Sequence, residues 1–319
     1  MCIRDSTHFT TPRWFAGAGG WSGPGAADRF ARYAEAAATR LGDLMGWVAT
    51  LNEPNVISLL MATGVIPLGA GASGTVAPPT VETGSTPVSA GVGGYDPATY
   101  AMGLVGAGLE TMAGIHRAGR EAVKQVAPHV QVGWTLALID LQAAPGGEER
   151  CEQGRRVAEV DWLDVSRDDD WVGVQTYSRN VIGPEGKVPP PEGTPLTQVG
   201  WEVYPEALGH TVRLAADHAR VPILVTENGM ATDDDAARIA YTEAALQGLA
   251  GCLDDGIDVR GYLHWTLLDN FEWMSGFHPT FGLVAVDRTT FVRTVKPSAR
   301  WLGEVARANA ITTTPAATT

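Results

Sequence analysis

Short apolar runs alternate with stretches of helical periodicity along this chain, and this alternation limits its possible folds more than any other feature. Five runs are interpreted as strands, and they begin near residues 47, 130, 171, 221 and 259. Helical patterns lie at 26–41, about 97–125, 146–164, 205–219 and 235–255. Single helices between successive strands are typical of parallel strands joined by helical crossovers. The pattern therefore predicts an α/β fold with a parallel sheet.

Polar residues follow several of these runs at the point where each strand is expected to end. Glu53 follows the run at 47–51, Tyr177 lies near the end of 170–179, and Glu227 directly follows 221–226. Side chains gathered at the carboxyl ends of successive parallel strands are typical of the active face of a (β/α) barrel. A doubly wound open sheet is the alternative, but no Gly-rich phosphate loop follows any of these strands.

Glu53 and Glu227 form the candidate catalytic pair. Two carboxylates that flank a glycosidic bond can supply an acid/base and a nucleophile. A separation of about 5–5.5 Å gives retention of the anomeric configuration, and about 6.5–9.5 Å gives inversion. Each glutamate is also compatible with a plain rim carboxylate in a salt bridge or a helix cap. The spacing of the residues alone leaves both interpretations open.

Composition and charge limit the partners of the chain. The net charge is −13, which disfavours nucleic acid and anionic membranes and suits an uncharged small substrate. Cys2, Cys151 and Cys252 are far apart and include no CxxC pair, so neither a disulfide framework nor a metal site is expected. With no apolar run of transmembrane length and no signal-peptide pattern, we expect a reducing, cytoplasmic location.

Three segments stand apart from the alternating pattern. Residues 1–15 contain no strand or helix long enough to begin a domain. Residues 69–94 are rich in Gly, Ala, Ser, Thr and Pro, which predicts a flexible surface loop. Residues 310–319 read as a disordered polar tail. Because the same rhythm continues on both sides of 69–94, we expect residues 1–319 to form a single domain.

Several motifs, in order, resemble glycoside hydrolase family 1, the β-glucosidase family. TLNEP at 50–54 and ILVTENG at 223–229 resemble the acid/base and nucleophile signatures of this family. GYLHWTLLDNFEW at 261–273, FGLVAVD at 281–287, THFTTPRWF at 7–15 and DDDWVGVQTYSR resemble further parts of it. The resemblance implies a (β/α)8 TIM barrel that is incomplete here, with the first two strands and most of the third missing. Residues 1–6 would then be an unrelated leader.

The resemblance also implies roles for individual residues. Glu53 aligns with the acid/base and Glu227 with the nucleophile, so the implied activity is retaining hydrolysis of terminal β-D-glucosides without a cofactor. His116 also matches a family position, and we interpret it as a packing residue. Tyr177 is implied to hydrogen-bond the nucleophile and hold it in place. The residues implied to bind substrate are His8, Asn52, Trp265, Glu272, Trp273 and Phe281.

Besides the missing strands, the chain departs from the family pattern at two places. Gln175-Thr176-Tyr177 stands where the family often has Asn-Tyr-Tyr, and no Asn lies near position 135. The loop GFHPTFG lacks the Lys that relatives acting on 6-phosphorylated sugars carry, which favours a free β-glucoside or oligosaccharide as the substrate. A catalytically inactive barrel fragment that retains only weak sugar binding is the alternative function, and the oligomeric state is left open.

Overall fold

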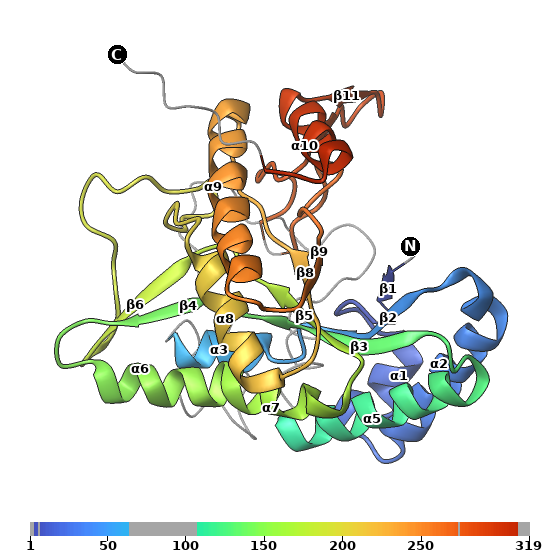
Figure 1. The fold of residues 1–319 in the computed structure, drawn as a ribbon. Coiled ribbons are helices and arrows are strands. Elements are labelled where there is room, and N and C mark those ends of the chain that lie inside the picture. The colour runs from blue at the N-terminus through green and yellow to red at the C-terminus, as the bar shows by residue number, and fades with distance from the viewer. Residues whose placement is uncertain (1–2, 6, 64–106, 274, 312–319) are drawn as a thin grey trace. The chain divides into compact units, whose positions relative to one another are not determined.

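The computed structural model describes residues 3–5, 7–63, 107–273 and 275–311 (Figure 1). The predicted flexible loop 69–94 and most of the predicted tail 310–319 lie outside the described residues. The chain divides into two compact units, and each is built from segments that alternate along the sequence. Neither unit is one contiguous piece of chain, so the single domain stays a prediction.

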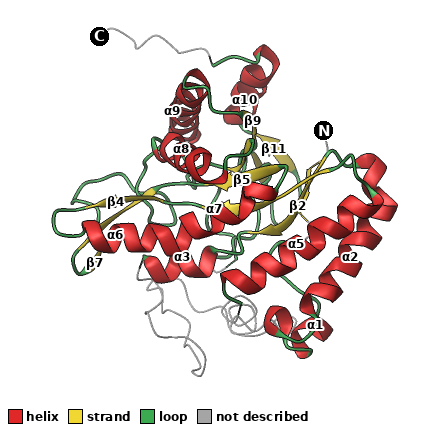
Figure 2. Cartoon of the chain, turned by 60° about the horizontal axis from the view of Figure 1, so that its bottom comes forward, coloured by secondary structure: helices red, strands yellow, loops and turns green. Residues whose placement is uncertain are grey.

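Unit 1 comprises Met1–Ala137, Glu152–Gly173 and His218–Val221. Its strand β2 (Trp47–Asn52) lies between β1 (Ile3–Asp5) and β3 (Gln131–Ala137), and both neighbours pair with β2 in parallel. Helices α2 (Ala26–Leu41) and α5 (Leu109–Val126) lie side by side in both views (Figures 1 and 2). The shorter helices of this unit are α1 (Arg13–Gly17), η1 (Gly20–Ser22), η2 (Gly42–Leu44), α3 (Val56–Ala62), the π turn η3 (Arg156–Val160), α7 (Asp161–Val165) and η4 (Ser166–Asp168).

The core of unit 1 follows from the sequence periodicity of its elements. Ala34 and Ala38 of α2 pack with Val123 of α5 and with the buried strand residues Val48 and Val132. Small residues on α2 let the two helices approach closely, and apolar side chains at helical spacing cover the sheet. The predicted helix 26–41 and the strand near 47 are therefore confirmed.

Unit 2 comprises Leu138–Cys151, Val174–Asp217 and Pro222–Thr319. Strands β8 (Ile223–Glu227) and β9 (Val259–Tyr262) pair in parallel. The remaining strands form a sheet of β4 (Asp140–Ala143), β6 (Arg179–Gly183) and β7 (Gly186–Val188) and a hairpin of β10 (Val284–Val286) and β11 (Arg293–Val295). Its helices are α9 (Asp235–Asp254), α10 (Pro297–Ala308) and most of α8 (Ala207–Ala219). The unit boundary passes through α6 (Glu148–Arg155) and β5 (Trp171–Gln175).

Several sequence-based boundaries need correction. Residues 1–15, which contain no strand or helix long enough to begin a domain by sequence, include the three-residue strand Ile3–Asp5, which forms by pairing with β2. The predicted helix 146–164 is interrupted by the π turn η3. The strand predicted to begin near residue 259 is β9, and it ends at Tyr262. Part of the predicted helix at 97–125 lies outside the described residues, and α5 begins at Leu109.

Helices α8 and α9 of unit 2 pack closely against each other. Gly209 of α8 lies near Gly248 of α9, and the thiol of Cys252 donates to the Gly209 carbonyl at 3.5 Å. Cys151 and Cys252 are both buried, and neither forms a disulfide within the described residues. Among the described helices, none combines the length and the apolar character needed to cross a membrane.

Candidate active site

Glu53 lies on a tight turn directly after β2. Its backbone is in the left-handed region at φ 47°, a conformation that costs a non-glycine residue roughly 1–3 kcal/mol. The Glu53 N–H donates to the Thr135 carbonyl of β3 at 2.9 Å, which holds the turn against the neighbouring strand. The carboxylate is half-buried. The strand end predicted from the sequence therefore does present this glutamate.

The buried amide of Asn55 maintains the shape of the same turn. Its Nδ2 donates to the carbonyls of Ala137 at 2.7 Å and Ala158 at 2.9 Å, and its Oδ1 accepts from the Ala137 N–H at 3.0 Å. The side chain is fully buried, so these bonds replace all contact with water. Asn55 thus connects the turn to the end of β3 and to the π turn η3. The sequence analysis did not single out this residue.

Asn52 is oriented by its neighbour on β3. Thr135 donates its hydroxyl to Asn52 Oδ1 at 2.9 Å, so the amide nitrogen of Asn52 is turned the other way, 3.4 Å from His8 Nε2. Thr135 thus occupies the strand position where no Asn was found. In unit 1 the structure brings together His8, Asn52 and Glu53, three of the predicted site residues.

Glu227 is the last residue of β8 and is 8% exposed. Tyr177 donates its phenol to Oε2 at 2.6 Å, and Gln175 donates its amide to Oε1 at 2.9 Å. A buried carboxylate is stabilised only when its oxygens accept hydrogen bonds or meet positive charge. The contact with Tyr177 was predicted. The contact with Gln175 was not, because the sequence shows only that this residue departs from the family pattern.

A buried hydrogen-bond network lies behind Glu227 and holds the adjacent strand ends. Asn228 is fully buried and donates to the Thr176 carbonyl at 2.8 Å and to the Tyr241 hydroxyl at 3.2 Å. Tyr241 on α9 donates to the Tyr177 carbonyl at 2.7 Å, and Tyr262 donates to Asn228 Oδ1 at 3.0 Å. Burial raises the pKa of both Tyr241 and Tyr262, so the two phenols stay neutral and can donate.

Trp265 and Glu272 contact each other in unit 2. The indole N–H of Trp265 donates to Glu272 Oε1 at 3.2 Å, and the backbone of Glu272 closes a turn with Gly276 through a hydrogen bond of 2.7 Å. Trp273 follows in this turn with φ 25°. A side chain at Gly229 would come within 2.1 Å of the Trp265 carbonyl, so glycine is required directly beyond the Glu227–Asn228 pair.

An aromatic group surrounds Tyr177. Phe281 is buried with its ring 5.9 Å from that of Tyr177 in an edge-on arrangement. Trp201 is 5.4 Å from Tyr177 and 6.4 Å from Phe281, and it is 40% exposed. Aromatic faces of this kind can pack on the apolar face of a sugar ring. Trp201 was missed because it lies in a loop without periodicity.

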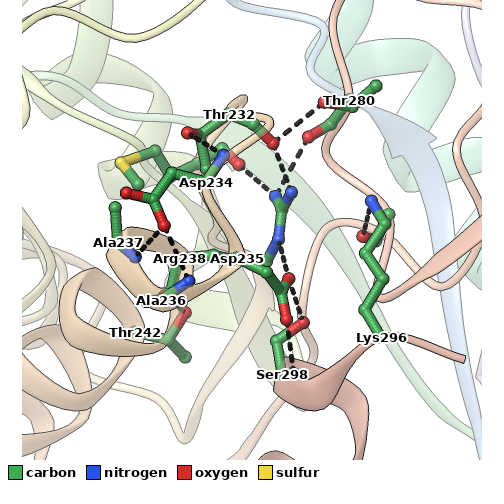
Figure 3. A network of polar contacts seen from close by, with 12 residues as sticks. Thr232, Asp234, Asp235, Ala236, Ala237, Arg238, Thr242, Thr280, Lys296 and Ser298 are labelled. Atoms are coloured by element: carbon green, nitrogen blue, oxygen red, sulfur yellow. Dashed lines mark hydrogen bonds and ion pairs between the residues drawn. The ribbon is translucent and has the colours of Figure 1, made fainter.

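Arg238 fixes the loops that follow β8 and precede β10 (Figure 3). Its buried guanidinium donates to the carbonyls of Met230 at 2.6 Å and Thr280 at 3.0 Å, and also to that of Thr232. Its Nε lies 3.0 Å from Asp235, whose other contact is the backbone and hydroxyl of Ser298 on α10. Although burial raises the pKa of Asp235, the hydrogen bonds from Ser298 and Arg238 outweigh it and leave the pKa lowered. The cluster therefore immobilises the chain beside Phe281.

His116 belongs to a buried network in unit 1. Its ring stacks on Trp134 at 4.4 Å, Nδ1 lies 2.6 Å from the Thr50 hydroxyl, and Nε2 lies 3.0 Å from Asp169. Burial raises the pKa of Asp169, and the hydrogen bond from His116 opposes this. These contacts agree with the predicted packing role. Within the described residues, no group of three or more His, Cys, Asp or Glu side chains is arranged to hold a metal ion.

Comparisons with known proteins agree with this arrangement. The family model described as glycosyl hydrolase family 1 matches residues 6–77 and 162–311. A β-galactosidase of Sulfolobus acidocaldarius is 29% identical over 95% of this chain and 65% of its own length. A thermostable β-glucosidase B of Thermobispora bispora is 31% identical over 95% of this chain and 67% of its own length. The chain thus spans about two thirds of the curated relatives that it matches.

A solved structure supports the same relationship. The crystal structure of a β-glycosidase is 44% identical, with a TM-score of 0.82 over 98% of this chain and 74% of that one. This likeness confirms the predicted fold class, a (β/α)8 barrel of which the chain covers a part. The matched residues include both Glu53 and Glu227. The chain belongs to glycosyl hydrolase family 1.

Proposed function

We propose that this chain is a retaining β-glycosidase that hydrolyses terminal β-D-glucosides by double displacement. The observation that carries the proposal is the buried Glu227 carboxylate, which accepts one hydrogen bond on each oxygen. Family membership and relatives named β-glucosidase and β-galactosidase support the same reaction class. In unit 1, the turn after β2 presents the second carboxylate, Glu53.

The proposed reaction assigns one role to each carboxylate. Ionised Glu227 attacks the anomeric carbon while protonated Glu53 donates its proton to the leaving oxygen. The resulting bond joins the sugar to Glu227. Glu53, now ionised, takes a proton from a water molecule that attacks the same carbon and releases Glu227. Substrate and product therefore share the β configuration.

The remaining predicted residues are proposed to bind the sugar. His8 and Asn52 would contact ring hydroxyls from unit 1, and Glu272 and Trp273 would do so from unit 2. Trp265 would lie under the sugar ring, with Phe281 as a wall. Because GFHPTFG at 276–282 contains no Lys, we infer an uncharged glycone rather than a phosphorylated one. Cys151 and Cys252 are buried and not joined in a disulfide, which supports a reducing, cytoplasmic location.

The Glu227→Ala variant tests the nucleophile. We expect hydrolysis of an aryl β-glucoside to fall by at least roughly 10⁴-fold, because no covalent intermediate can form. Added azide should restore turnover and give the α-glucosyl azide, since the small anion attacks from the vacated face. The product is identified by NMR. Unchanged hydrolysis, or a β-configured azide product, would refute the assignment of Glu227.

Glu53→Ala provides the matched variant. We expect a loss of about 10²–10⁴-fold on substrates with poor leaving groups and a much smaller loss on activated aryl glycosides. Azide should here give the β-glucosyl azide, because Glu227 still forms the intermediate. Equal losses on both substrate types would rule out proton transfer by Glu53.

Weak sugar binding without hydrolysis is the second candidate function. It is considered because the chain covers 65% of the length of one curated relative. The two candidates differ in a simple assay. A chromogenic β-glucoside is turned over in the first case. In the second case glucose quenches or shifts tryptophan fluorescence at millimolar concentration, and no chromophore is released by the parent chain.

A further inference from the structure

The residue that departs from the family pattern at the end of β5 contacts the proposed nucleophile. Gln175 is 2% exposed, and its Nε2 donates to Glu227 Oε1 at 2.9 Å. Tyr177 donates to the other oxygen at 2.6 Å. The two donors are two residues apart in an extended segment, where alternate side chains face the same side. One segment thus supplies a separate donor to each oxygen of the carboxylate.

The backbone fixes the position of this donor pair. The Thr176 N–H donates to the Glu227 carbonyl at 3.2 Å, and Asn228 donates to the Thr176 carbonyl at 2.8 Å. The strand end that carries the donors is therefore joined to the strand end that carries the acceptor. With both oxygens bound, rotation of the carboxylate about its terminal torsion would break two hydrogen bonds at once. The geometry defines one orientation of Glu227.

Three ionisable side chains of unit 2 are connected to Glu227 through Asn228. Burial raises the pKa values of Tyr241 and Tyr262, and burial lowers the pKa of His264 to about 4. These three side chains, which reach Glu227 through Asn228, are therefore neutral near pH 7. Gln175 and Tyr177 each donate a hydrogen bond to the negatively charged carboxylate.

We propose that Gln175 is a positioning residue that, together with Tyr177, orients the Glu227 carboxylate and favours its ionised form. The inference rests on the proposed function only in naming Glu227 the nucleophile. An uncharged amide donor favours a carboxylate over a carboxylic acid, because it stabilises charge on the oxygen that it contacts. Loss of the amide should therefore make Glu227 easier to protonate and free its orientation.

The test is a pH titration of the carboxyl groups of the full chain. It is monitored by ¹³C NMR on protein labelled at glutamate Cδ. The Glu227 signal is assigned by its absence in Glu227→Gln. In Gln175→Leu, which keeps the volume and removes the donor, the protonation midpoint of Glu227 should rise by roughly one pH unit, a tenfold change in its ionisation constant. Gln153→Leu, an exposed amide on α6, is the control and should leave the midpoint unchanged.

Two further variants keep the test decisive if Gln175→Leu does not fold. Gln175→Asn retains an amide that is one methylene too short to reach Oε1, so the midpoint should also rise. Gln175→Glu keeps the shape and replaces the donor by a second carboxyl group, so the rise should be largest. A midpoint unchanged from the parent in whichever of these variants folds would overturn the proposal.

Kinetics separate this inference from the proposed function. For an active parent, the acidic limb of the kcat/KM profile should move with the Glu227 midpoint, and kcat should fall more than KM changes. If the parent chain does not hydrolyse β-glucosides but the midpoint still shifts, the proposed function fails and the role of Gln175 stands. If the parent is active and the midpoint does not shift, only the role of Gln175 fails.

Discussion

At the scale of single residues, this chain holds its two carboxylates by different means. Glu53 is presented by a backbone in the left-handed region, and Asn55 maintains that turn through three hydrogen bonds. Glu227 is held by side-chain donors from the end of β5, Gln175 and Tyr177. The first arrangement stores conformational strain, and the second replaces lost hydration.

Asn55→Ala should therefore destabilise the protein. The change leaves the Ala137 N–H and two carbonyls without their buried partner, which we expect to lower the free energy of unfolding by about 2–4 kcal/mol. Urea unfolding followed by circular dichroism measures this value. Gln153→Ala, which removes an exposed amide, should change it by less than about 0.5 kcal/mol. Similar stabilities for the two variants would contradict the anchoring role of Asn55.

At the scale of elements, the first turn of α9 organises the loops around it. Asp234 caps the helix by accepting from the N–H groups of Ala236 and Ala237. One turn later, Arg238 donates hydrogen bonds to a carbonyl of the loop after β8 and to the Thr280 carbonyl (Figure 3). Side chains at a helix start thus determine the path of two loops, one of which carries Phe281.

Arg238→Met tests this organisation. Removing the buried guanidinium takes away the ion pair with Asp235 and the hydrogen bonds to the carbonyls of Met230, Thr232 and Thr280, so we expect the free energy of unfolding to fall by about 3–5 kcal/mol. Hydrogen exchange at the Thr232 and Thr280 amides should accelerate beyond the global change. Arg213→Met removes an exposed ion pair with Asp255 and should cost less than about 1 kcal/mol. Equal effects of the two changes would show that the cluster has no special role.

At the scale of the whole molecule, acidic conditions act through both surface and interior groups. The net charge of −13 at pH 7 decreases in magnitude as the carboxylates protonate. In the interior, burial lowers the pKa of His264 from an ordinary 6.5 to about 4. Its Nδ1 lies 3.2 Å from the Tyr262 hydroxyl, on the segment that continues from β9.

We expect His264 to make stability fall with decreasing pH. The unfolded chain takes up a proton on this ring below about pH 6.5, whereas the folded protein does so only near pH 4. Its contribution to the free energy of unfolding is therefore complete above pH 6.5. This contribution, at most about 3 kcal/mol, is lost as the pH falls towards 4. His264→Gln should flatten this part of the stability–pH curve from urea titrations. Gln153→Leu, which changes an exposed uncharged side chain, should not flatten it, and equal curves for the two variants would disprove the expectation.

The sequence predicted the elements that have a strong periodic signal and missed those that depend on distant partners. The run ILVTE alone indicates β8, and the apolar spacing of 26–41 indicates α2. By contrast, β10 and β11 are three residues each, and all three residues of β11 are exposed. These strands are therefore stabilised by pairing with each other. Short strands of this kind have no signature of their own.

The same distinction applies to the candidate site. Glu53 and Glu227 could be proposed as a pair because each follows an apolar run at a strand end, and the family resemblance of the surrounding motifs implies their roles. The contacts of Gln175 and Thr135 could not, because an amide or hydroxyl becomes a donor to Glu227 or Asn52 only when two strand ends lie side by side. Asn55 joins residues that are 82 and 103 positions away along the chain. Such contacts are set by tertiary structure.

The cluster around Arg238 also has a consequence for the order of folding. Its guanidinium reaches Thr280, 42 residues away, and Asp235 reaches Ser298, 63 residues away. Each long chain segment must close before these bonds can form, so we expect the cluster to assemble after the rate-limiting barrier. Substitutions there should hasten unfolding while leaving the rate of refolding nearly unchanged. The lifetime of the folded protein, rather than the speed at which it forms, is thus set beside Arg238.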